Sequence, residues 1–438
     1  MTERDGMDKK MNEPIKLASP AEAGPKQISL HLMVKNGESV VGRLLDCVGP
    51  YITGVVAVLN DCTDRTADVL ADKSSQYSLL PPVLITVTSE THPDLYIRDV
   101  AETYAVGKPL VGEVYEGPFT GRQILADWAG ARNLGWQVCS GRWKLFCDAD
   151  DVISDPQSLP GLCRLLDERG LVAAASRYHY EVGLGGASRV DTFRERLARD
   201  LPGIRWSGCV HEHLTGFDAR HVAQVDGTLV VRDMRDSEGT GIRIPGRNLK
   251  VLYHSARERD WQITTREMIY LAAESRAVMP RLAVKLIELY LPASRWPEEK
   301  SWAASMMGEI CENDEDYASA SLWYEWSHDF YPGVLPNMRL ARARFHQGLW
   351  AEAVAAYERG IALRGKIQLL DGGEAYEGAT QVLVVACLRK LGRVAEAARM
   401  CEEASSKYPH MAALREMREV LARDESRTRN SVTPGGRS

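Results

Sequence analysis

Between residues 27 and 258, short runs of β-branched and other apolar residues alternate with stretches whose apolar residues recur at helical spacing. This alternation is typical of βαβ units, which build a mostly parallel sheet flanked by helices. The candidate strands, separated by candidate helices, are 28–34, 52–60 and 83–88. We therefore expect an α/β domain over 27–258, with ligand-binding loops at the carboxyl ends of its strands.

After residue 259 the strand pattern fades, and Ala, Leu, Arg and Glu dominate at helical spacing. Three similar segments place Ala320, Ala353 and Ala397 in register. The first spacing is 33 residues, close to the tetratricopeptide period, whereas the second is 44 and requires an insertion. Residues 259–425 are therefore predicted to form tetratricopeptide-like helical hairpins that bury their apolar faces by stacking. A generic helical bundle is the alternative.

Polar segments without periodicity frame these two domains. Residues 1–26 and 426–438 combine charged, Pro and Gly residues with few apolar ones, so we expect both tails to be disordered. The predicted layout is thus a tail, an α/β domain, an all-α repeat domain and a second tail.

The overall composition is that of an ordinary soluble protein, with a formal net charge of −6. That balance gives no general attraction to nucleic acid or to anionic membranes. The nine cysteines contain no CxxC pair, as expected for free thiols in a reducing compartment. No stretch approaches the roughly 18 apolar residues of a membrane span, so a cytoplasmic protein without a transmembrane segment is expected.

A cluster of like charge follows one of the apolar runs. Asp148, Asp150 and Asp151 come directly after the apolar run 145–147, which is typical of a buried strand. Because side chains two residues apart share one side of an extended segment, Asp148 and Asp150 can approach one divalent cation. Carboxylate oxygens suit Mg²⁺ or Mn²⁺. A solvated turn without any metal is the alternative for this motif taken alone.

Three other stretches carry groups suited to the same chemistry. A polar turn with Asp61 and Asp64 follows the second strand and offers acceptors for a ribose or a base. Arg132 lies on a predicted helix ahead of the acidic cluster, where it can brace a phosphate or an aspartate. The segment "WSGCVHEHL" gathers aromatic, imidazole and carboxylate groups around Glu212.

The order "ISLHLMVKNGES", "VAVLNDCTDRT", "DWAGARN", "LFCDADD" and "WSGCVHEHL" resembles the family 2 glycosyltransferases of GT-A fold. The resemblance is to the subgroup whose catalytic domain is followed by tetratricopeptide-like helices, and it covers 27–258 and the helical region. It implies a nucleotide-diphosphate sugar as donor, a uridine diphosphate sugar by default. The residues that the resemblance places at the nucleotide-sugar site are Lys35, Asn36, Glu38, Asp61, Asp64, Arg132 and Asp148.

The resemblance also implies a metal site and a reaction. Asp148 and Asp150 would hold Mn²⁺ or Mg²⁺, with His254 as a third ligand. The implied reaction moves a sugar to an acceptor hydroxyl or thiol with inversion, and it requires a general base. Our first candidate for the base is Glu212, and our second is Asp151.

Some features depart from the family pattern or stay open. Leu59 occupies the position where the family usually has an aspartate, which leaves the nucleotide open. A peptide or protein, a saccharide or another polymer is the acceptor, with the repeats holding the acceptor or a partner protein. The alternative function is a non-catalytic tetratricopeptide adaptor that carries a degenerate transferase domain.

Overall fold

The computed structural model describes residues 27–98, 104–105, 114–115, 121–180, 190–225, 231–233, 246–364, 373–409 and 411–431. The chain divides into two compact units, one of residues 1–104 and 115–263 and the other of residues 105–114 and 264–438. The predicted N-terminal tail 1–26 lies outside the described residues. The predicted C-terminal tail begins inside helix α16 (Ala412–Ser431), whose Arg- and Glu-rich sequence favours a helix beyond the expected end.

A nine-stranded sheet is the framework of the first unit, with the order β3-β2-β1-β8-β11-β10-β15-β9 and β14 paired to β10. The strands are β1 Ile28–Val34, β2 Gly54–Asn60, β3 Val83–Val87, β8 Trp143–Phe146, β9 Asp151–Ile153, β10 Ala173–Tyr180, β11 Val190–Arg199, β14 Val222–Val225 and β15 Val231–Asp233. Strands β3, β2, β1 and β8 are parallel, as expected, whereas β11 is antiparallel to β8. The sheet is therefore mixed, because β10 and β11 form an antiparallel pair that the sequence pattern did not reveal.

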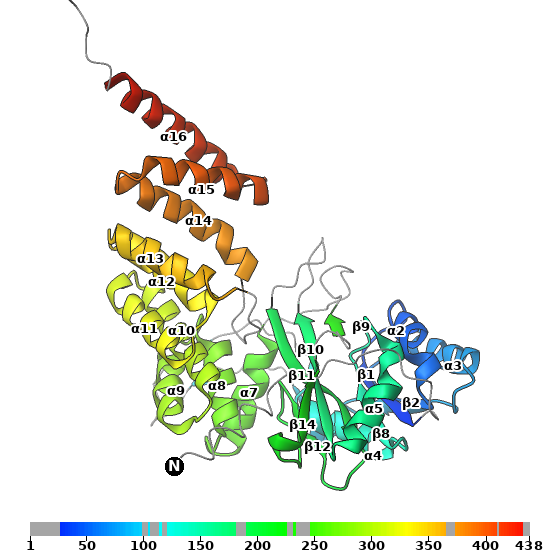
Figure 1. The fold of residues 1–438 in the computed structure, drawn as a ribbon. Helices are drawn as coiled ribbons and strands as arrows, with labels where there is room; N and C mark the ends of the chain where they lie inside the picture. The colour runs from blue at the N-terminus through cyan, green and yellow to red at the C-terminus, as the bar shows by residue number, and fades with distance from the viewer. Residues whose placement is uncertain are drawn as a thin grey trace, which may run out of the picture. The chain divides into compact units, whose positions relative to one another are not determined.

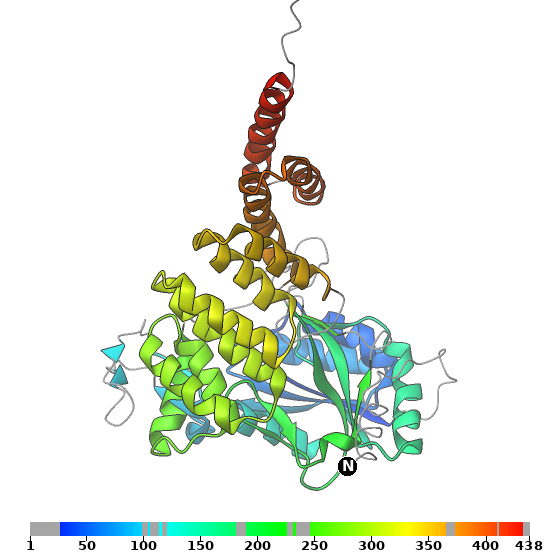
Figure 2. The ribbon, with the colours of Figure 1, turned by 60° about the vertical axis from the view of Figure 1, so that its left-hand side comes forward.

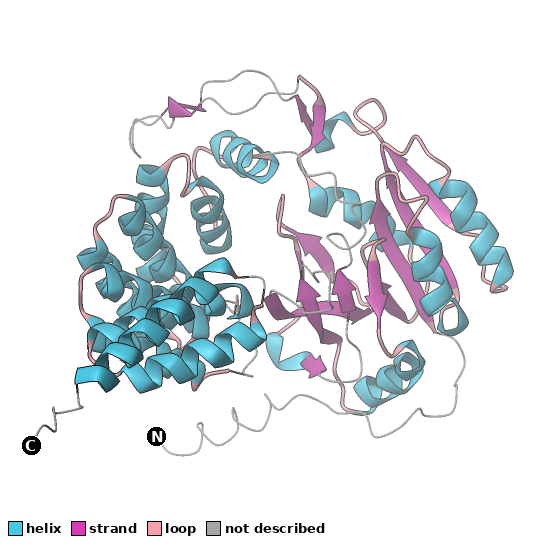
Figure 3. Cartoon of the chain, turned by 90° about the horizontal axis from the view of Figure 1, so that it is seen from above, coloured by secondary structure: helices cyan, strands magenta, loops and turns pink. Residues whose placement is uncertain are grey.

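Both faces of β1 are buried, which explains its nearly continuous apolar sequence. Leu30 and Leu32 pack in one core with residues of helices α2 (Val41–Val48), α3 (Thr66–Gln76) and α5 (Leu159–Glu168). Met33 packs with Ala131 of α4 (Trp128–Val138) in a separate cluster. Figure 3 shows helices on both sides of the strands. The helices of this unit are α2 Val41–Val48, α3 Thr66–Gln76, α4 Trp128–Val138, α5 Leu159–Glu168 and α7 Arg247–Glu258.

Three two-stranded ribbons complete the strands: β4 Tyr96–Arg98 with β7 Gln123–Leu125, β5 Tyr104–Ala105 with β6 Val114–Tyr115, and β12 Arg205–Ser207 with β13 His213–Thr215. The β12–β13 ribbon packs on α4. It thereby brings the loop between β12 and β13 to the helix that precedes β8. This packing supports one side of the candidate site.

The second unit consists mainly of helices in sequential antiparallel pairs, coloured from green to red in Figures 1 and 2. Their bounds are α8 Thr265–Ser275, α9 Pro280–Ala293, α10 Pro297–Asn313, α11 Tyr317–Phe330, α12 Val334–His346, α13 Trp350–Ile361, α14 Gly373–Lys390, α15 Val394–Lys407 and α16 Ala412–Ser431. The aligned alanines Ala320, Ala353 and Ala397 are fully buried on α11, α13 and α15. Small residues at these positions let paired helices approach closely.

An α/β unit followed by helical repeats confirms the predicted fold class. The pair α8–α9 precedes the three repeats that the sequence revealed. None of the described helices combines the length and the apolar character that a membrane crossing requires.

Candidate functional site

The acidic segment Asp148–Asp151 lies between β8 and β9 and forms the centre of the candidate site. The Asp148 N–H donates to Asp151 Oδ2 at 2.8 Å, and the Asp151 N–H donates to the Asp148 carbonyl at 3.0 Å. These two bonds close a tight loop. Arg43 fixes the next residue, because its Nη2 donates to the Asp150 carbonyl at 3.0 Å. The loop therefore presents its carboxylates on a constrained backbone.

Two arginines compensate the charge of Asp148. Arg132 Nη2 lies 3.4 Å from Oδ1, and Arg196 Nη2 lies 3.4 Å from Oδ2. Both guanidinium side chains are less than a tenth exposed, whereas the Asp148 side chain is 36% exposed. The distances exceed the roughly 2.7–2.9 Å of a tight charge-assisted hydrogen bond. Asp148 is thus oriented by two cations while about a third of its side chain stays exposed.

Asp151 has a different environment, with no exposed surface. Its Oδ1 accepts a hydrogen bond from the Tyr178 hydroxyl at 2.8 Å, and Arg196 Nη2 lies 3.5 Å from Oδ2. Burial raises the pKa of Asp151 to about 7, with the nearby Arg196 charge opposing this rise. An acceptor cannot reach an enclosed carboxylate, so the choice of Asp151 as second candidate base needs correction. Its hydrogen bonds make it a support of the Asp148 loop.

Arg196 was missed by the sequence reasoning. It lies on β11, whose antiparallel register sets Leu197 opposite Leu145 and so brings Arg196 beside the end of β8. Its guanidinium carbon lies 4.9 Å from the centre of the Phe146 ring and 4.3 Å from that of Tyr178. Each such contact contributes roughly 0.5–2 kcal/mol. The alternating basic residues of "FRERLAR" were the available signal, but they do not reveal which strand lies next to them.

Arg132 on α4 joins the acidic loop to the segment around Glu212. Its Nε donates to Glu212 Oε1, and its guanidinium lies 4.1 Å from the Phe146 ring centre. The next residue, Asn133, fixes β12: its amide donates to the Trp206 carbonyl at 3.0 Å and accepts from the Trp206 N–H at 2.9 Å. The "ARN" motif therefore has one residue for the ion pairs and one for the β12 backbone. Arg132 links the predicted metal ligand to the first candidate base.

The loops after β1 and β2 carry the other predicted nucleotide-site residues, and hydrogen bonds connect them. The Glu38 N–H donates to Asp64 Oδ2 at 2.9 Å, and the Arg65 N–H donates to Glu38 Oε2 at 3.1 Å. Asn36 Oδ1 accepts from the Thr63 N–H at 2.8 Å. These three predicted side chains therefore shape the two loops.

Asp64 also binds the first residue of α3, since its Oδ1 accepts from the Thr66 N–H at 3.1 Å and from the Thr66 hydroxyl at 2.5 Å. Burial opposes ionisation, but the bonds from Thr66 and from the Glu38 N–H outweigh it and lower the pKa of Asp64. Lys35 and Asp61 form a 3.4 Å ion pair between the two loops, and their side chains are 50% and 43% exposed. Both side chains therefore keep exposed surface that a ligand could contact.

The predicted three-ligand metal site is not assembled. Among the described residues, no three His, Cys, Asp or Glu side chains form a group that could hold a metal ion, so Asp148, Asp150 and His254 do not gather. His254 lies in the middle of α7 and is partly buried. The carboxylates of Asp148 and Asp150 still provide hard oxygen donors two residues apart, and a magnesium-type ion held by one or two carboxylates keeps several water ligands. This donor set fits such an ion.

Comparison with known protein families decides how to interpret this geometry. Residues 124–230 match the family model described as glycosyl transferase family 2. This match confirms the resemblance and supports a glycosyltransferase. The family 2 segment, as we call residues 124–230, contains Arg132, Asp148, Asp150, Arg196 and Glu212.

Solved structures resemble the two units at low identity. The crystal structure of S. aureus TarS 1-349 is 12% identical, covers 79% of this chain and 95% of that chain, and has a TM-score of 0.32. TTC0263, a thermophilic TPR protein from Thermus thermophilus, is 12% identical over 40% of this chain and 88% of its own, with a TM-score of 0.27. No curated protein matches the sequence. Because these TM-scores are low, the interpretation of the site depends on the family 2 segment and on the geometry described above.

Proposed function

We propose that the chain is a metal-dependent glycosyltransferase that moves a sugar from a nucleotide-diphosphate sugar to an acceptor hydroxyl or thiol. The observation that carries the proposal is the position of Asp148, which lies at the end of β8 between two nearly buried arginines. Ligands of open α/β sheets bind at the carboxyl ends of the strands. The loops after β1 and β2 begin at the same edge of the sheet as the Asp148 loop, because β1 runs parallel to β8 and β2 runs parallel to β1.

Asp148 and Asp150 would hold Mn²⁺ or Mg²⁺ at this edge. The ion would supply positive charge to the diphosphate as the bond to the sugar breaks. The accessibility of Asp148 and its loose contacts with the guanidinium groups support this assignment. Arg132 and Arg196 act as positioning residues, because each acts through Asp148.

Glu212 is the proposed general base. In direct displacement, the acceptor oxygen or sulfur forms a bond to the anomeric carbon from the face opposite the diphosphate, and its proton passes to a Glu212 oxygen. The nucleoside diphosphate leaves with the electron pair of the broken bond, so the configuration inverts. The ion pair with Arg132 orients Glu212 and leaves one carboxylate oxygen outside that bond.

The nucleotide site would lie along the loops after β1 and β2. Lys35 and Asp61 would contact the donor, while Asn36, Glu38 and Asp64 keep the two loops in register. The default donor is a uridine diphosphate sugar. The helical repeats would hold the acceptor or a partner protein, since stacked helix pairs create extended concave surfaces.

The proposal is tested by ligand-induced stabilisation. Uridine, guanosine and cytidine diphosphates are added with and without Mn²⁺, and the unfolding temperature is measured for the full chain. A ligand at about 100 times its Kd stabilises a protein by about 2.7 kcal/mol. We expect one of the three to raise the unfolding temperature only when Mn²⁺ is present. Asp150→Asn should abolish this rise, whereas Asp72→Asn, at an exposed residue of α3, should retain it. No rise with any of the three would favour the adaptor.

A further inference from the structure

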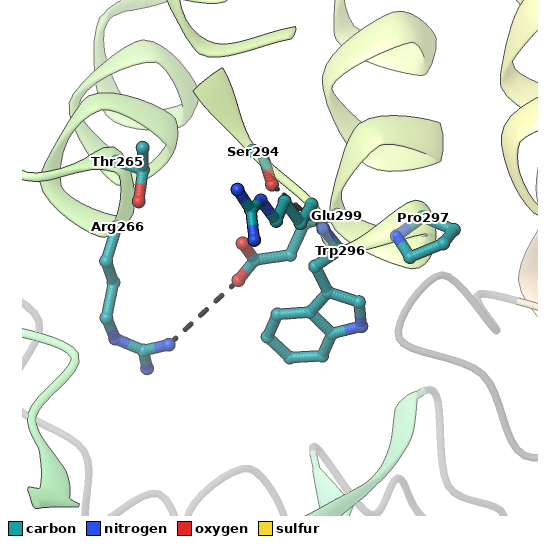
Figure 4. Close-up of a pocket in the computed structure, with 7 residues that line it drawn as sticks. Thr265, Arg266, Ser294, Trp296, Pro297 and Glu299 are labelled. Atoms are coloured by element: carbon teal, nitrogen blue, oxygen red, sulfur yellow. Dashed lines mark hydrogen bonds and ion pairs between the residues drawn. The ribbon is translucent and has the colours of Figure 1, made fainter. Parts of the chain in front are cut away.

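A pocket of about 550 Å³ opens in the helical unit between the start of α8 and the turn that joins α9 to α10. This volume lies within the range of roughly 300–1,000 Å³ found for small-molecule sites. Figure 4 shows Arg266 and the Trp296 indole extending toward the same open space. The lining side chains that matter to its chemistry are Thr265, Arg266, Ser294, Arg295, Trp296 and Glu299.

The floor of the pocket is a fixed carboxylate. Glu299 is only 6% exposed, and one of its oxygens accepts from the buried Tyr290 hydroxyl at 2.6 Å. Its other oxygen faces Arg266 Nη1 at 4.0 Å. Arg266 is in turn held over the Tyr270 ring, with 5.0 Å from the guanidinium carbon to the ring centre. A hydrogen-bond acceptor, the Glu299 carboxylate, and a hydrogen-bond donor, the Arg266 guanidinium, are therefore held side by side by the surrounding side chains.

The wall of the pocket is an exposed aromatic ring. Trp296 is 48% exposed although it immediately precedes α10, and its backbone N–H is fixed by a 3.2 Å bond to Ser294 Oγ. Arg295 beside it is also exposed. The backbone of this residue is therefore constrained, while the indole keeps about half of its surface available for stacking.

The combination selects a class of ligand. An aliphatic chain would displace water from the Arg266 guanidinium and the Glu299 carboxylate without offering either group a hydrogen bond, which is costly. A polyphosphate would meet the two arginines but also the negative charge of Glu299. A sugar ring presents an apolar C–H face to an indole and hydroxyl groups that donate to a carboxylate and accept from a guanidinium. We propose that this pocket is a saccharide-binding site.

The site gives the helical unit its own affinity for carbohydrate. It is lined by residues of α8, of α10 and of the turn between α9 and α10, and it contains none of the residues assigned to the donor site. It does not depend on the proposed transfer reaction, because saccharide binding is measured without nucleotide or metal. A failure of the donor site and a failure of this pocket therefore give separate results.

The test is titration calorimetry of the full chain with neutral trisaccharides, namely maltotriose, cellotriose, chitotriose and mannotriose. We expect at least one to bind, and Trp296→Ala to weaken its binding roughly three- to tenfold, the size of one aromatic stacking contact. Trp326→Ala is the matched control, since Trp326 on α11 is 53% exposed and does not line the pocket. It should leave the affinity unchanged.

Arg295→Ala is a second variant at the exposed wall, where truncation does not disturb the core, and it should weaken the same trisaccharide. The proposal is overturned if no trisaccharide binds, if Trp326→Ala weakens binding as much as Trp296→Ala, or if neither pocket variant changes the affinity. Inorganic pyrophosphate and a neutral peptide are titrated alongside. The proposal would also be overturned if no trisaccharide bound while pyrophosphate or the peptide bound and Trp296→Ala abolished that binding.

Discussion

Arg132 and Arg196 contact opposite oxygens of the Asp148 carboxylate, each at 3.4 Å. The first arginine comes from α4 and the second from β11, so two elements far apart in the sequence converge on one acid. Each arginine also serves a second carboxylate, Glu212 for Arg132 and Asp151 for Arg196. Two guanidinium groups thus compensate the negative charge of Asp148 and Asp151 after β8.

Removal of Arg196 should destabilise the first unit strongly. Arg196→Leu leaves the fully buried Asp151 without its cation, and breaking one side of a buried ion pair costs about 3–5 kcal/mol. Urea denaturation measures the free energy of unfolding. Arg199→Leu, on the same strand but with a 29% exposed side chain, should cost less than about 1 kcal/mol. Equal losses in the two variants would show that Arg196 does not stabilise Asp151.

Arg132→Lys should lower catalysis while the fold is kept. Lysine preserves the charge but lacks the planar fork that contacts Asp148 and Glu212 together. We expect kcat/KM to fall about tenfold to a hundredfold, equivalent to roughly 1.4–2.7 kcal/mol. Arg142→Lys is the control, because Arg142 pairs with Asp167 at the surface. Activity like that of the unmodified protein in Arg132→Lys would mean that charge alone suffices at this position.

Acid should destabilise the first unit through His31. Burial, followed by the nearby Arg132 charge, lowers the pKa of His31 to about 3 from its ordinary 6.5. Stability from the neutral imidazole is thus complete above pH 6.5 and declines toward pH 3, by up to about 1.4 kcal/mol per pH unit.

Urea denaturation at pH 7, 5.5 and 4.5 measures this dependence. His31→Leu should flatten the curve, whereas His221→Leu, at an exposed histidine, should not. Parallel curves for the unmodified chain and His31→Leu would contradict the assignment.

Gly308→Ala should destabilise the helical unit. A Cβ at Gly308 would lie 2.4 Å from Tyr324 Cε1, and the Tyr324 side chain is fully buried, so the ring cannot move away freely. Overpacking of this kind costs about 1–3 kcal/mol. Gly42→Ala, on helix α2, meets its nearest atoms at 3.5 Å and should be neutral or stabilising. Thermal unfolding compares them, and an unchanged midpoint for Gly308→Ala would contradict the close packing.

The sequence was informative wherever a local pattern determines the structure. The runs at 28–34 and 52–60 became β1 and β2, since a strand buried on both faces needs a continuous apolar sequence. The register of Ala320, Ala353 and Ala397 revealed the repeats, because close helix packing selects small residues. The proximity of Arg132 to Asp148 followed from a helix that leads directly into β8.

Contacts between distant segments were beyond such patterns. The ion pair of Arg196 depends on the antiparallel register of β11 against β8, which no periodicity encodes. Asp150 and Asp151 look alike in the sequence, yet Asp151 is enclosed by Tyr178 and Arg196. His254 was placed at the metal by resemblance alone, and α7 does not bring it into a three-ligand group with the aspartates.

The most direct test of the central claim is release of nucleoside diphosphate from a panel of sugar nucleotides in the presence of Mn²⁺ or Mg²⁺. The account predicts turnover of one donor that chelation of the metal abolishes. Asp148→Asn and Asp150→Asn should each lower it at least about a hundredfold, or roughly 2.7 kcal/mol, while Asp72→Asn retains it. Turnover that survives both substitutions and chelation would contradict the role assigned to this acidic pair.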